Sequence, residues 1–334
     1  MNNEGDRMDR RMFFKKASIG VASGAAVLTP SAAMAKDIEF KNQIGSLIDL
    51  SLCDGCIDND SPKCVMACKE KNKAKFPQPQ KPIMDYWPRK GHEDWSNEQE
   101  RIDRLTPYNW TFIEKVEVEG EQVYIPRRCM HCDNPACLNL CPFGTIGKTK
   151  QGAVFIDSDY CMGGAKCRDV CPWEIPQRQA GVGLYMKLVP KLGGGGVMYK
   201  CDGCADLQAK GELPVCQTSC PKDAITFGNF EQIKELAQKR AQKMGGYIYG
   251  LDQGGGTGTI YVSKVPFEKI DAAIAKAKAN DSEKRPGRPH MKVDLADSMS
   301  DATNWAAASI IAPFAGVAAA AIAVHKSKKG GSDE

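Results

Sequence analysis

Residues 160–172 read YCMGGAKCRDVCP. Three of its residues, Cys161, Cys167 and Cys171, are cysteines, and a proline follows the last of them. They match three of the four positions in the spacing C-x2-C-x2-C-x3-C-P. Gly164 stands where the second cysteine would be. The other cysteines of the chain decide whether this is a damaged motif or a working one.

All 15 cysteines of the 334-residue chain fall into four motifs of this kind. Motif I holds Cys53, Cys56, Cys64 and Cys68; motif II holds Cys129, Cys132, Cys137 and Cys141; motif III holds Cys161, Cys167 and Cys171; motif IV holds Cys201, Cys204, Cys216 and Cys220. Each motif ends in C-x3-C, and a proline follows it in motifs II, III and IV. This internal repeat predicts several copies of one structural unit.

Thiolates at this spacing are typical of bacterial ferredoxins, where three cysteines of a motif wrap one iron–sulfur cube. The fourth cysteine is expected to start the next helix and to reach the neighbouring cube, so motifs work in pairs. Motifs II and III are close in sequence and should pair, which leaves motif I for motif IV. The pattern predicts an α+β fold with two bacterial-type (2×[4Fe-4S]) ferredoxin modules and crossed cysteine ligands.

The pairing predicts four sets of iron ligands, which are called sites 1 to 4 below. Site 1 is Cys53, Cys56, Cys64 and Cys220; site 2 is Cys68, Cys201, Cys204 and Cys216; site 3 is Cys129, Cys132, Cys137 and Cys171; site 4 is Cys141, Cys161 and Cys167. Site 4 has three thiolates because Gly164 supplies none.

Two other readings of the cysteines compete with iron–sulfur clusters. Tetrahedral zinc also binds paired C-x2-C, but it gives no reason for the recurring C-x3-C or for the prolines. Disulfides are common in exported proteins, yet an odd number of cysteines leaves one unpaired. We expect His131, inside C-M-H-C, to lie beside a cluster or in solvent rather than to bind iron. Lys69 and Lys200 adjoin site 2 cysteines, and they either raise the potential of that cluster or lie solvated at the surface.

No catalytic residues are predicted, because the chain shows no nucleophile–base arrangement and no dinucleotide fingerprint in a strand–helix setting. The net charge of +4 gives no strong field for nucleic acid.

The first 35 residues predict an export signal. Arg10 and Arg11 lie in D-R-R-M-F-F-K, a weakly apolar stretch follows, and Ala33-Met34-Ala35 forms an A-x-A cleavage pattern. Paired arginines in this setting resemble a twin-arginine signal, with an ordinary secretory signal or a basic tail as the alternatives. Twin-arginine export carries proteins that are already folded around their cofactors, which suits clusters in an oxidising compartment.

Residues 302–325 predict a transmembrane helix. The segment 305–324 is uncharged over 20 residues, which as a helix would span about 30 Å, the thickness of the bilayer core. Three lysines follow it and three aspartates precede it, so the positive-inside rule places the tail 326–334 in the cytoplasm and the body on the periplasmic side. An alanine-rich helix of a soluble protein is the alternative.

The remaining segments complete the predicted domain organisation. One module comprises 43–74 with 195–230, the other 126–190, with an insert at 75–125 and a C-terminal extension and tether at 231–300. The insert should close with a hairpin, TFIEKVEVEGEQVYIP, turning at Gly120. In the extension we expect a helix over 231–244 and a strand TIYVS, preceded by a turn at the glycines 254–256.

The motifs, in the order CDGC…C…CK, CMHCDNPACLNLCP, CMGGAKCRDVCP and CDGC…CQTSCP, resemble those of the iron–sulfur electron-transfer (beta) subunits of the complex iron–sulfur oxidoreductases. The resemblance covers about residues 43–230. That family includes subunits of formate dehydrogenase, of polysulfide, dimethyl sulfoxide and nitrate reductases, and of membrane-bound [NiFe] hydrogenase. It implies a non-catalytic relay between a catalytic subunit and a membrane subunit that binds quinone or haem.

The layout of an export signal and one C-terminal helix is most similar to the hydrogenase member of the family. The alternative is the beta subunit of a molybdopterin enzyme, such as formate dehydrogenase or a sulfur-compound reductase.

Gly164 is the departure from the family pattern. Members that lose one cysteine of this kind often carry a [3Fe-4S] cluster. The resemblance thus implies three [4Fe-4S] clusters at sites 1 to 3 and one [3Fe-4S] cluster at site 4. Four [4Fe-4S] clusters, with water or hydroxide on one iron of site 4, are the alternative. A reductase acting alone at that open iron, and a zinc scaffold, are the other two functional hypotheses.

Overall fold

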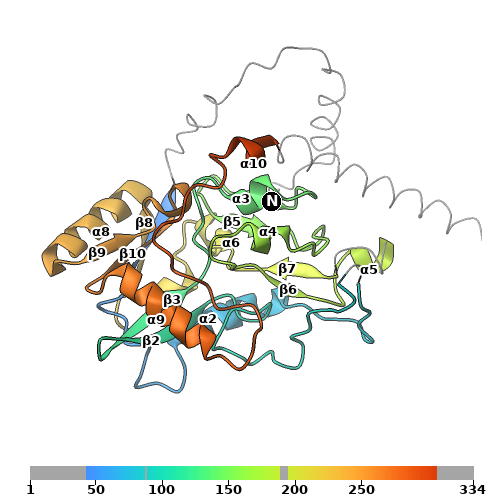
Figure 1. Cartoon of the computed structure of the whole chain (residues 1–334), viewed down its shortest axis with the longest axis horizontal. Helices are drawn as coiled ribbons and strands as arrows, with labels where there is room; N and C mark the ends of the chain where they lie inside the picture. The colour runs from blue at the N-terminus through green and yellow to red at the C-terminus, as the bar shows by residue number, and fades with distance from the viewer. Residues whose placement is uncertain (1–42, 87–88, 189–194, 307–334) are drawn as a thin grey trace, which may run out of the picture. The chain divides into compact units, whose positions relative to one another are not determined.

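A four-stranded sheet joins motifs I and IV to the C-terminal extension (Figure 1). β1 (Ile44–Asp49) pairs antiparallel with β8 (Ile225–Asn229) and parallel with β10 (Thr259–Ser263), and β9 (Tyr247–Tyr249) pairs antiparallel with β10. The strand predicted at TIYVS is therefore confirmed as β10. The computed structural model describes residues 43–86, 89–188 and 195–306.

The helix α8 (Phe230–Met244) packs on this sheet. It begins where the Asn229 side chain accepts a hydrogen bond from the Glu231 backbone N–H at 3.1 Å, and it ends at Gly245, which has a φ of 61°. Its buried residues recur every four positions, at Ile233, Ala237 and Ala241, and they pack against Leu47, Ile260 and Val262 of the sheet. The predicted helix over 231–244 is confirmed.

The insert closes with the predicted hairpin. β2 (Phe112–Val118) and β3 (Glu121–Arg127) pair antiparallel, and Glu119 and Gly120 both have positive φ in the turn. The helix α9 (Phe267–Ala279) packs on β2. The turn predicted before β10 is also present, as the short helix η2 (Gln253–Gly255).

The other elements are short and surround the cysteine motifs. The helices are α2 (Lys63–Asn72), η1 (Lys73–Lys75), α3 (Ala136–Asn139), α4 (Lys166–Asp169), α5 (Tyr185–Leu188), α6 (Ala205–Gln208), α7 (Val215–Thr218) and α10 (Ala302–Ala306). Two-stranded sheets are formed by β4 (Ile146–Lys148) with β5 (Val154–Ile156), and by β6 (Gln177–Gln179) with β7 (Val197–Tyr199). The last pair joins the start of the segment 195–230 to a strand of the module 126–190.

The expectation that the fourth cysteine of each motif starts a helix was wrong. In motif I the third and fourth cysteines, Cys64 and Cys68, both lie inside α2. In the other motifs the third cysteine lies in a short helix, α3, α4 or α7, and the fourth follows the end of that helix. The C-x3-C spacing therefore sets two thiols about one turn apart along one helix axis. α2 packs on α7, and α3 packs on α4, which brings together motifs I and IV and motifs II and III.

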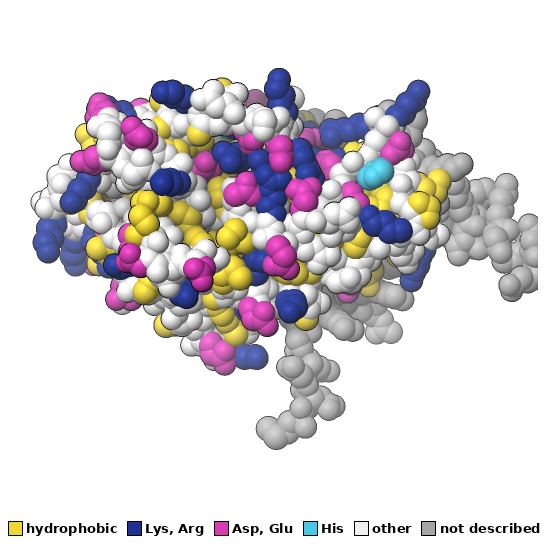
Figure 2. Space-filling view, turned by 90° about the horizontal axis from the view of Figure 1, so that it is seen from below, with side chains coloured by type: hydrophobic (Ala, Val, Ile, Leu, Met, Phe, Trp, Pro, Cys, Tyr) yellow, Lys and Arg dark blue, Asp and Glu magenta, His cyan; other side chains and the backbone are white. Residues whose placement is uncertain are grey.

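The segment 281–300, predicted as part of a tether, packs against the body. Met291 and Met299 are almost fully buried. Arg104, which is 1% exposed, forms an ion pair with Asp281 at 2.7 Å, and Arg101 pairs with Glu283 at 2.7 Å. On the face of the molecule that Figure 2 shows, basic and acidic side chains are interspersed and do not form a field of one sign.

The predicted export signal (1–35) and most of the predicted membrane helix (302–325) lie outside the described residues, apart from α10. Within the described parts of the chain, no helix has the length and apolar character needed to cross a membrane.

Candidate metal centres

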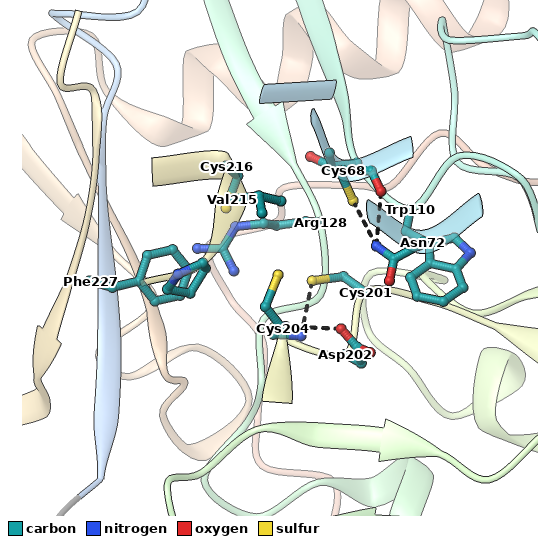
Figure 3. Close-up of a pocket in the computed structure, with 13 residues that line it drawn as sticks. Cys68, Asn72, Trp110, Arg128, Cys201, Asp202, Cys204, Val215, Cys216 and Phe227 are labelled. Carbon is teal, nitrogen blue, oxygen red and sulfur yellow. Dashed lines mark hydrogen bonds between the residues drawn. The ribbon is translucent and has the colours of Figure 1, made fainter. Parts of the chain in front are cut away.

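Site 2 lines a buried pocket between α2, α7 and the loop after β7. Its four thiols, Cys68, Cys201, Cys204 and Cys216, all border this pocket, which Figure 3 shows in close-up. All four cysteines are at most 9% exposed. Backbone and side-chain donors already point at two of the sulfurs: the Gly203 N–H at 3.4 Å from Cys201 Sγ, and the Asn72 amide at 3.5 Å from Cys68 Sγ.

Site 1 lines a second pocket, next to the hairpin. Cys53, Cys56, Cys64 and Cys220 border it together with apolar side chains from β2, β3 and β8. Burial, together with the neighbouring thiolates of Cys220 and Cys56, raises the pKa of the Cys53 thiol to about 11. Thiols from motif I and from motif IV therefore lie side by side at this pocket.

Site 3 gathers three thiols of motif II with one of motif III. Burial raises the pKa of Cys132 well above its ordinary value, and the thiolates of Cys171, Cys129 and Cys137 add to the shift. Burial likewise raises the pKa of Cys171 to about 11, with Cys129 again contributing. Each of these thiols is thus within electrostatic reach of the others.

Site 4 gathers Cys141, Cys161 and Cys167. Burial raises the pKa of Cys167, and the thiolates of Cys161 and Cys141 contribute to the shift. The Cys161 sulfur accepts hydrogen bonds from the backbone N–H groups of Met198 and Gly163, at 3.4 and 3.5 Å.

Gly164 is exposed beside site 4, and packing does not require a glycine at this position. A Cβ atom there would have one neighbour within 4 Å, Phe143 at 3.7 Å, and the backbone is outside the left-handed region. The absent fourth thiol is therefore a property of the sequence rather than a steric demand of the fold.

The two CDGC loops of motifs I and IV have matching geometry. Asp54 accepts a hydrogen bond from the Cys56 N–H, and Asp202 accepts one from the Cys204 N–H, both at 2.9 Å. Each aspartate also pairs with a lysine that follows the last cysteine of the other motif: Asp54 with Lys222 at 3.1 Å, and Asp202 with Lys75 at 2.8 Å. Two ion pairs in a nearly symmetric arrangement therefore join motif I to motif IV.

Arg128 was not predicted as a site residue, although its position directly before motif II could have indicated a role. It is 2% exposed and borders the site 2 pocket. One guanidinium nitrogen donates to Ser46 Oγ at 2.6 Å, and the group lies 4.9 Å from the Phe227 ring centroid. Its Nε and Nη1 have no hydrogen-bond partner in the described structure. Burying unpaired cationic donors costs free energy unless an anion lies beside them. The pocket is therefore suited to a negatively charged group.

Lys200 and Lys69 are both buried rather than solvated. Lys200 donates from Nζ to the Val154 carbonyl at 2.5 Å and to the Cys201 carbonyl at 3.0 Å, and its charge acts on Cys129 and Cys137. Lys69 donates to the Gln99 carbonyl at 2.5 Å. The alternative that these lysines lie solvated at the surface was wrong.

The residues at the four sites fit iron–sulfur clusters. Thiols gather in sets of four or three in buried places, and at site 2 a buried guanidinium lacks a partner that four thiolates around an iron–sulfur core would supply. Within residues 43–86, 89–188 and 195–306, no group of three or more His, Cys, Asp or Glu could hold a single metal ion.

Thiols of different sites also raise one another's pKa values, and these pairs show which sites lie next to each other. After burial, the main cause of the raised pKa of Cys64 in site 1 is the thiolate of Cys216 in site 2. Burial raises the pKa of Cys201 in site 2 to about 11, with a contribution from Cys129 in site 3. Burial also raises the pKa of Cys167 in site 4, with contributions from site 3 thiolates. The neighbour relations run from site 1 to site 2, then site 3, then site 4.

His131 lies where sites 2 and 3 approach each other. It is 7% exposed, and its Nε2 is 3.7 Å from the Cys201 sulfur. Burial lowers the pKa of His131 well below its ordinary value, and the charges of Lys200 and Arg128 lower it further. Of the two places expected for this histidine, beside a cluster site or in solvent, the structure shows the first, at site 2.

The cysteine motifs also match those of known iron–sulfur proteins. Two models described as 4Fe-4S dicluster domains match residues 52–145 and 120–230. The Hydrogenase-2 operon protein HybA of Escherichia coli O157:H7 is 30% identical over 306 residues, which cover 79% of this chain and 83% of that protein.

Two further relatives come from Escherichia coli strain K12. The iron–sulfur subunit of the nitrate-inducible formate dehydrogenase is 30% identical over 67% of this chain and 69% of its own. YnfG, a probable anaerobic dimethyl sulfoxide reductase subunit, is 31% identical over 58% of this chain and 77% of its own.

Proposed function

This protein belongs to the family of iron–sulfur electron-transfer subunits of oxidoreductase complexes, and from that premise we propose that it relays electrons between a catalytic subunit and a membrane subunit. The proposal depends most on one observation: the four thiol sets lie next to one another in a series, from site 1 through sites 2 and 3 to site 4, across both pairs of motifs. A relay needs such a series, whereas an isolated structural metal does not.

In this proposal the cysteines of sites 1 to 3 each hold a [4Fe-4S] cluster, and the three cysteines of site 4 hold a [3Fe-4S] cluster. Iron–sulfur clusters supply one-electron transfer at potentials that depend on hydrogen bonds to the sulfurs and on solvent exposure. The chain's contribution is to bury the thiolates, to offer N–H donors to them, and to place Arg128 and Lys200 beside the two middle sites. A fourth iron at site 4, carrying water or hydroxide, is the alternative.

The membrane subunit is proposed to dock near site 4. Met299, which lies shortly before α10 and the predicted membrane helix, is fully buried against Ala136 and Leu140 of the α3 region. α3 lies between Cys132 and Cys141, so it borders sites 3 and 4, and Figure 1 draws α10 beside it. This packing supports a membrane helix that starts next to the site 4 end of the series, which leaves the site 1 end for the catalytic subunit.

The chain is proposed to lie on the periplasmic side of the cytoplasmic membrane, with its C-terminus in the cytoplasm. The paired arginines near the start and the lysines after residue 325 support this placement. A chain truncated after residue 301 should leave the membrane fraction if it is expressed without its partners. Retention in the membrane would contradict anchoring by the C-terminal helix.

A hydrogenase is the proposed catalytic partner, because the HybA relative is matched over the largest share of both chains among those described above. A molybdopterin enzyme, such as a formate dehydrogenase or a sulfur-compound reductase, is the alternative. Anaerobic co-purification identifies the partner directly.

The test of the function is reduction of the clusters through that partner. The purified complex should show partial reduction of its iron–sulfur absorbance on addition of the partner's electron donor, and the isolated chain should show none. A colourless protein that holds zinc would refute the proposal. Turnover of a substrate by the isolated chain would replace it with a reductase acting alone at site 4.

A further inference from the structure

His131 occupies a backbone position that the other three motifs give to glycine. Gly55, Gly163 and Gly203, each two residues after the first cysteine of its motif, have φ values of 67°, 64° and 68°. His131 holds the same place in motif II and has a φ of 49°. Side chains other than glycine rarely adopt this left-handed conformation, and where they do so the strain often serves a function.

The hydrogen bonds of the His131 ring show which of its two nitrogens carries the hydrogen. The backbone N–H of Val154 donates to Nδ1 of His131 at 2.9 Å, and an N–H group can only donate. Nδ1 is therefore the acceptor, and the neutral ring carries its hydrogen on Nε2. Nε2 faces Cys201 Sγ at 3.7 Å, so the ring donates to that sulfur.

The donor and the acceptor belong to different modules. His131 stands between Cys129 and Cys132 of site 3, but the sulfur it reaches is a site 2 thiol. The loop of motif IV is shaped to admit the ring, because a Cβ atom on Gly203 would come within 3.2 Å of His131 Cε1. The motif II loop thereby inserts a hydrogen-bond donor into the neighbouring site.

We propose that His131 is a positioning residue that raises the reduction potential of the cluster at site 2 by donating a hydrogen bond from Nε2 to Cys201. This inference rests on the proposed iron–sulfur occupancy of site 2. An added electron increases the negative charge on the ligand sulfurs, so a donor to a sulfur stabilises the reduced state. The imidazole keeps its proton throughout, and the electron alone is transferred.

The test compares two variants in the intact complex. His131→Leu removes the donor, whereas His131→Gln retains an N–H group near the Nε2 position. His92→Leu, at a partly exposed histidine that pairs with Asp85, serves as the matched control. Iron content is measured first, and the midpoint potentials of the reduced clusters are then followed by EPR-monitored redox titration.

The proposal expects one midpoint potential to become more negative in His131→Leu and to return toward the wild-type value in His131→Gln. His92→Leu should leave all midpoint potentials unchanged. Unchanged potentials in a fully loaded His131→Leu protein would overturn the proposal.

A second measurement does not depend on the folding of a variant. In wild-type complex labelled with histidine that carries 15N in the imidazole ring only, pulsed EPR of the reduced protein should show a weak 15N coupling to one cluster. Its absence would overturn the proposal even if His131→Leu failed to load iron. A wild-type protein without iron would instead refute the proposed function, so the two failures are distinguishable.

Discussion

Cys64 and Cys68 lie one turn apart on the same helix, α2, and border two different pockets. Cys64 lines the pocket that also contains Cys220, and Cys68 lines the pocket that also contains Cys201. One short helix therefore serves two thiol sets, and both sets combine cysteines that are far apart in the sequence. This arrangement is the structural basis of the relay proposed above, because it places two sites next to each other.

The crossed ligands predict which cysteine variants share a phenotype. Cys220→Ala should alter the same cluster as Cys53→Ala, because both thiols border the site 1 pocket. Cys216→Ala, only four residues earlier in the chain, should alter the cluster that Cys68→Ala alters. Redox-titrated EPR spectra of the four variants check this grouping. Grouping by sequence motif, with Cys216 and Cys220 affecting one cluster, would contradict it.

The Gly164→Cys variant should change the number of irons at site 4. The backbone accepts the side chain, since a Cβ atom would meet only Phe143 at an ordinary distance of 3.7 Å. The oxidised wild-type complex should show the EPR signal of a [3Fe-4S] cluster, and the variant should lack it. Gly91→Cys is the matched control, because a Cβ atom there would have one neighbour within 4 Å, the Arg89 carbonyl oxygen at 3.9 Å, and its backbone is also outside the left-handed region. An oxidised wild type without the signal would rule out the three-iron assignment.

Arg128→Leu should lower the potential of the cluster at site 2. The guanidinium has two donors without partners in the described structure, and a hydrogen bond to a charged group contributes about 1.5–3 kcal/mol. Removing the cation should make one midpoint potential more negative by on the order of 60 mV, which is a tenfold change in a one-electron equilibrium constant. Arg128→Lys keeps the charge and should show a smaller shift. Equal potentials in the wild type and Arg128→Leu, at equal iron content, would show that the guanidinium does not act on the cluster.

Glu93→Gln should destabilise the fold around motif III. Glu93 accepts two hydrogen bonds from Arg168 of α4, both at 2.8 Å, and one from Arg178 at 2.5 Å. Burial alone would raise the pKa of Glu93, but the two arginines outweigh it and hold the pKa below its ordinary value of 4.5. Breaking such a partly buried pair should cost about 3 kcal/mol near pH 7, measured by thermal unfolding.

The decrease in the free energy of unfolding caused by Glu93→Gln should become smaller at low pH. A carboxylate whose pKa is lowered in the folded state stabilises the fold above its unfolded pKa, and this contribution is lost as the pH falls through the folded value. The difference between wild type and Glu93→Gln should therefore be constant from pH 7 to about pH 5 and shrink only at lower pH. If the stability difference between wild type and Glu93→Gln shrank between pH 7 and pH 5, this would contradict the lowered pKa of Glu93.

Local patterns in the sequence were enough to predict several parts of this structure. The alternation in TFIEKVEVEGEQVYIP predicted the hairpin. The helix α8 was predicted from apolar residues near one face, namely Ile233, Leu236, Ala237 and Met244. Both patterns depend on residues that are close in the chain. The cysteine sets could be proposed because C-x3-C recurs four times. The thiols of each set are indeed brought together, although iron binding by them stays a prediction.

Features that depend on distant segments could not be predicted. Nothing in IGSLID indicates that β1 pairs in parallel with TIYVS, more than 200 residues later. The burial of Met299 against α3, the unpaired donors of Arg128 and the reach of His131 into site 2 all depend on how separate motifs pack. Cys68 lies inside a helix and the other fourth cysteines follow the end of one, and these placements depend on helix lengths that the motif spacing does not specify.

The most direct test of the account is Mössbauer spectroscopy of the anaerobically purified complex after selective 57Fe enrichment of this chain. Iron in [4Fe-4S] and [3Fe-4S] environments is expected in a ratio of about four to one, because three sites hold four irons each and one site holds three. Iron in [4Fe-4S] environments alone would contradict the assignment of site 4. A chain without cluster iron would contradict the relay itself.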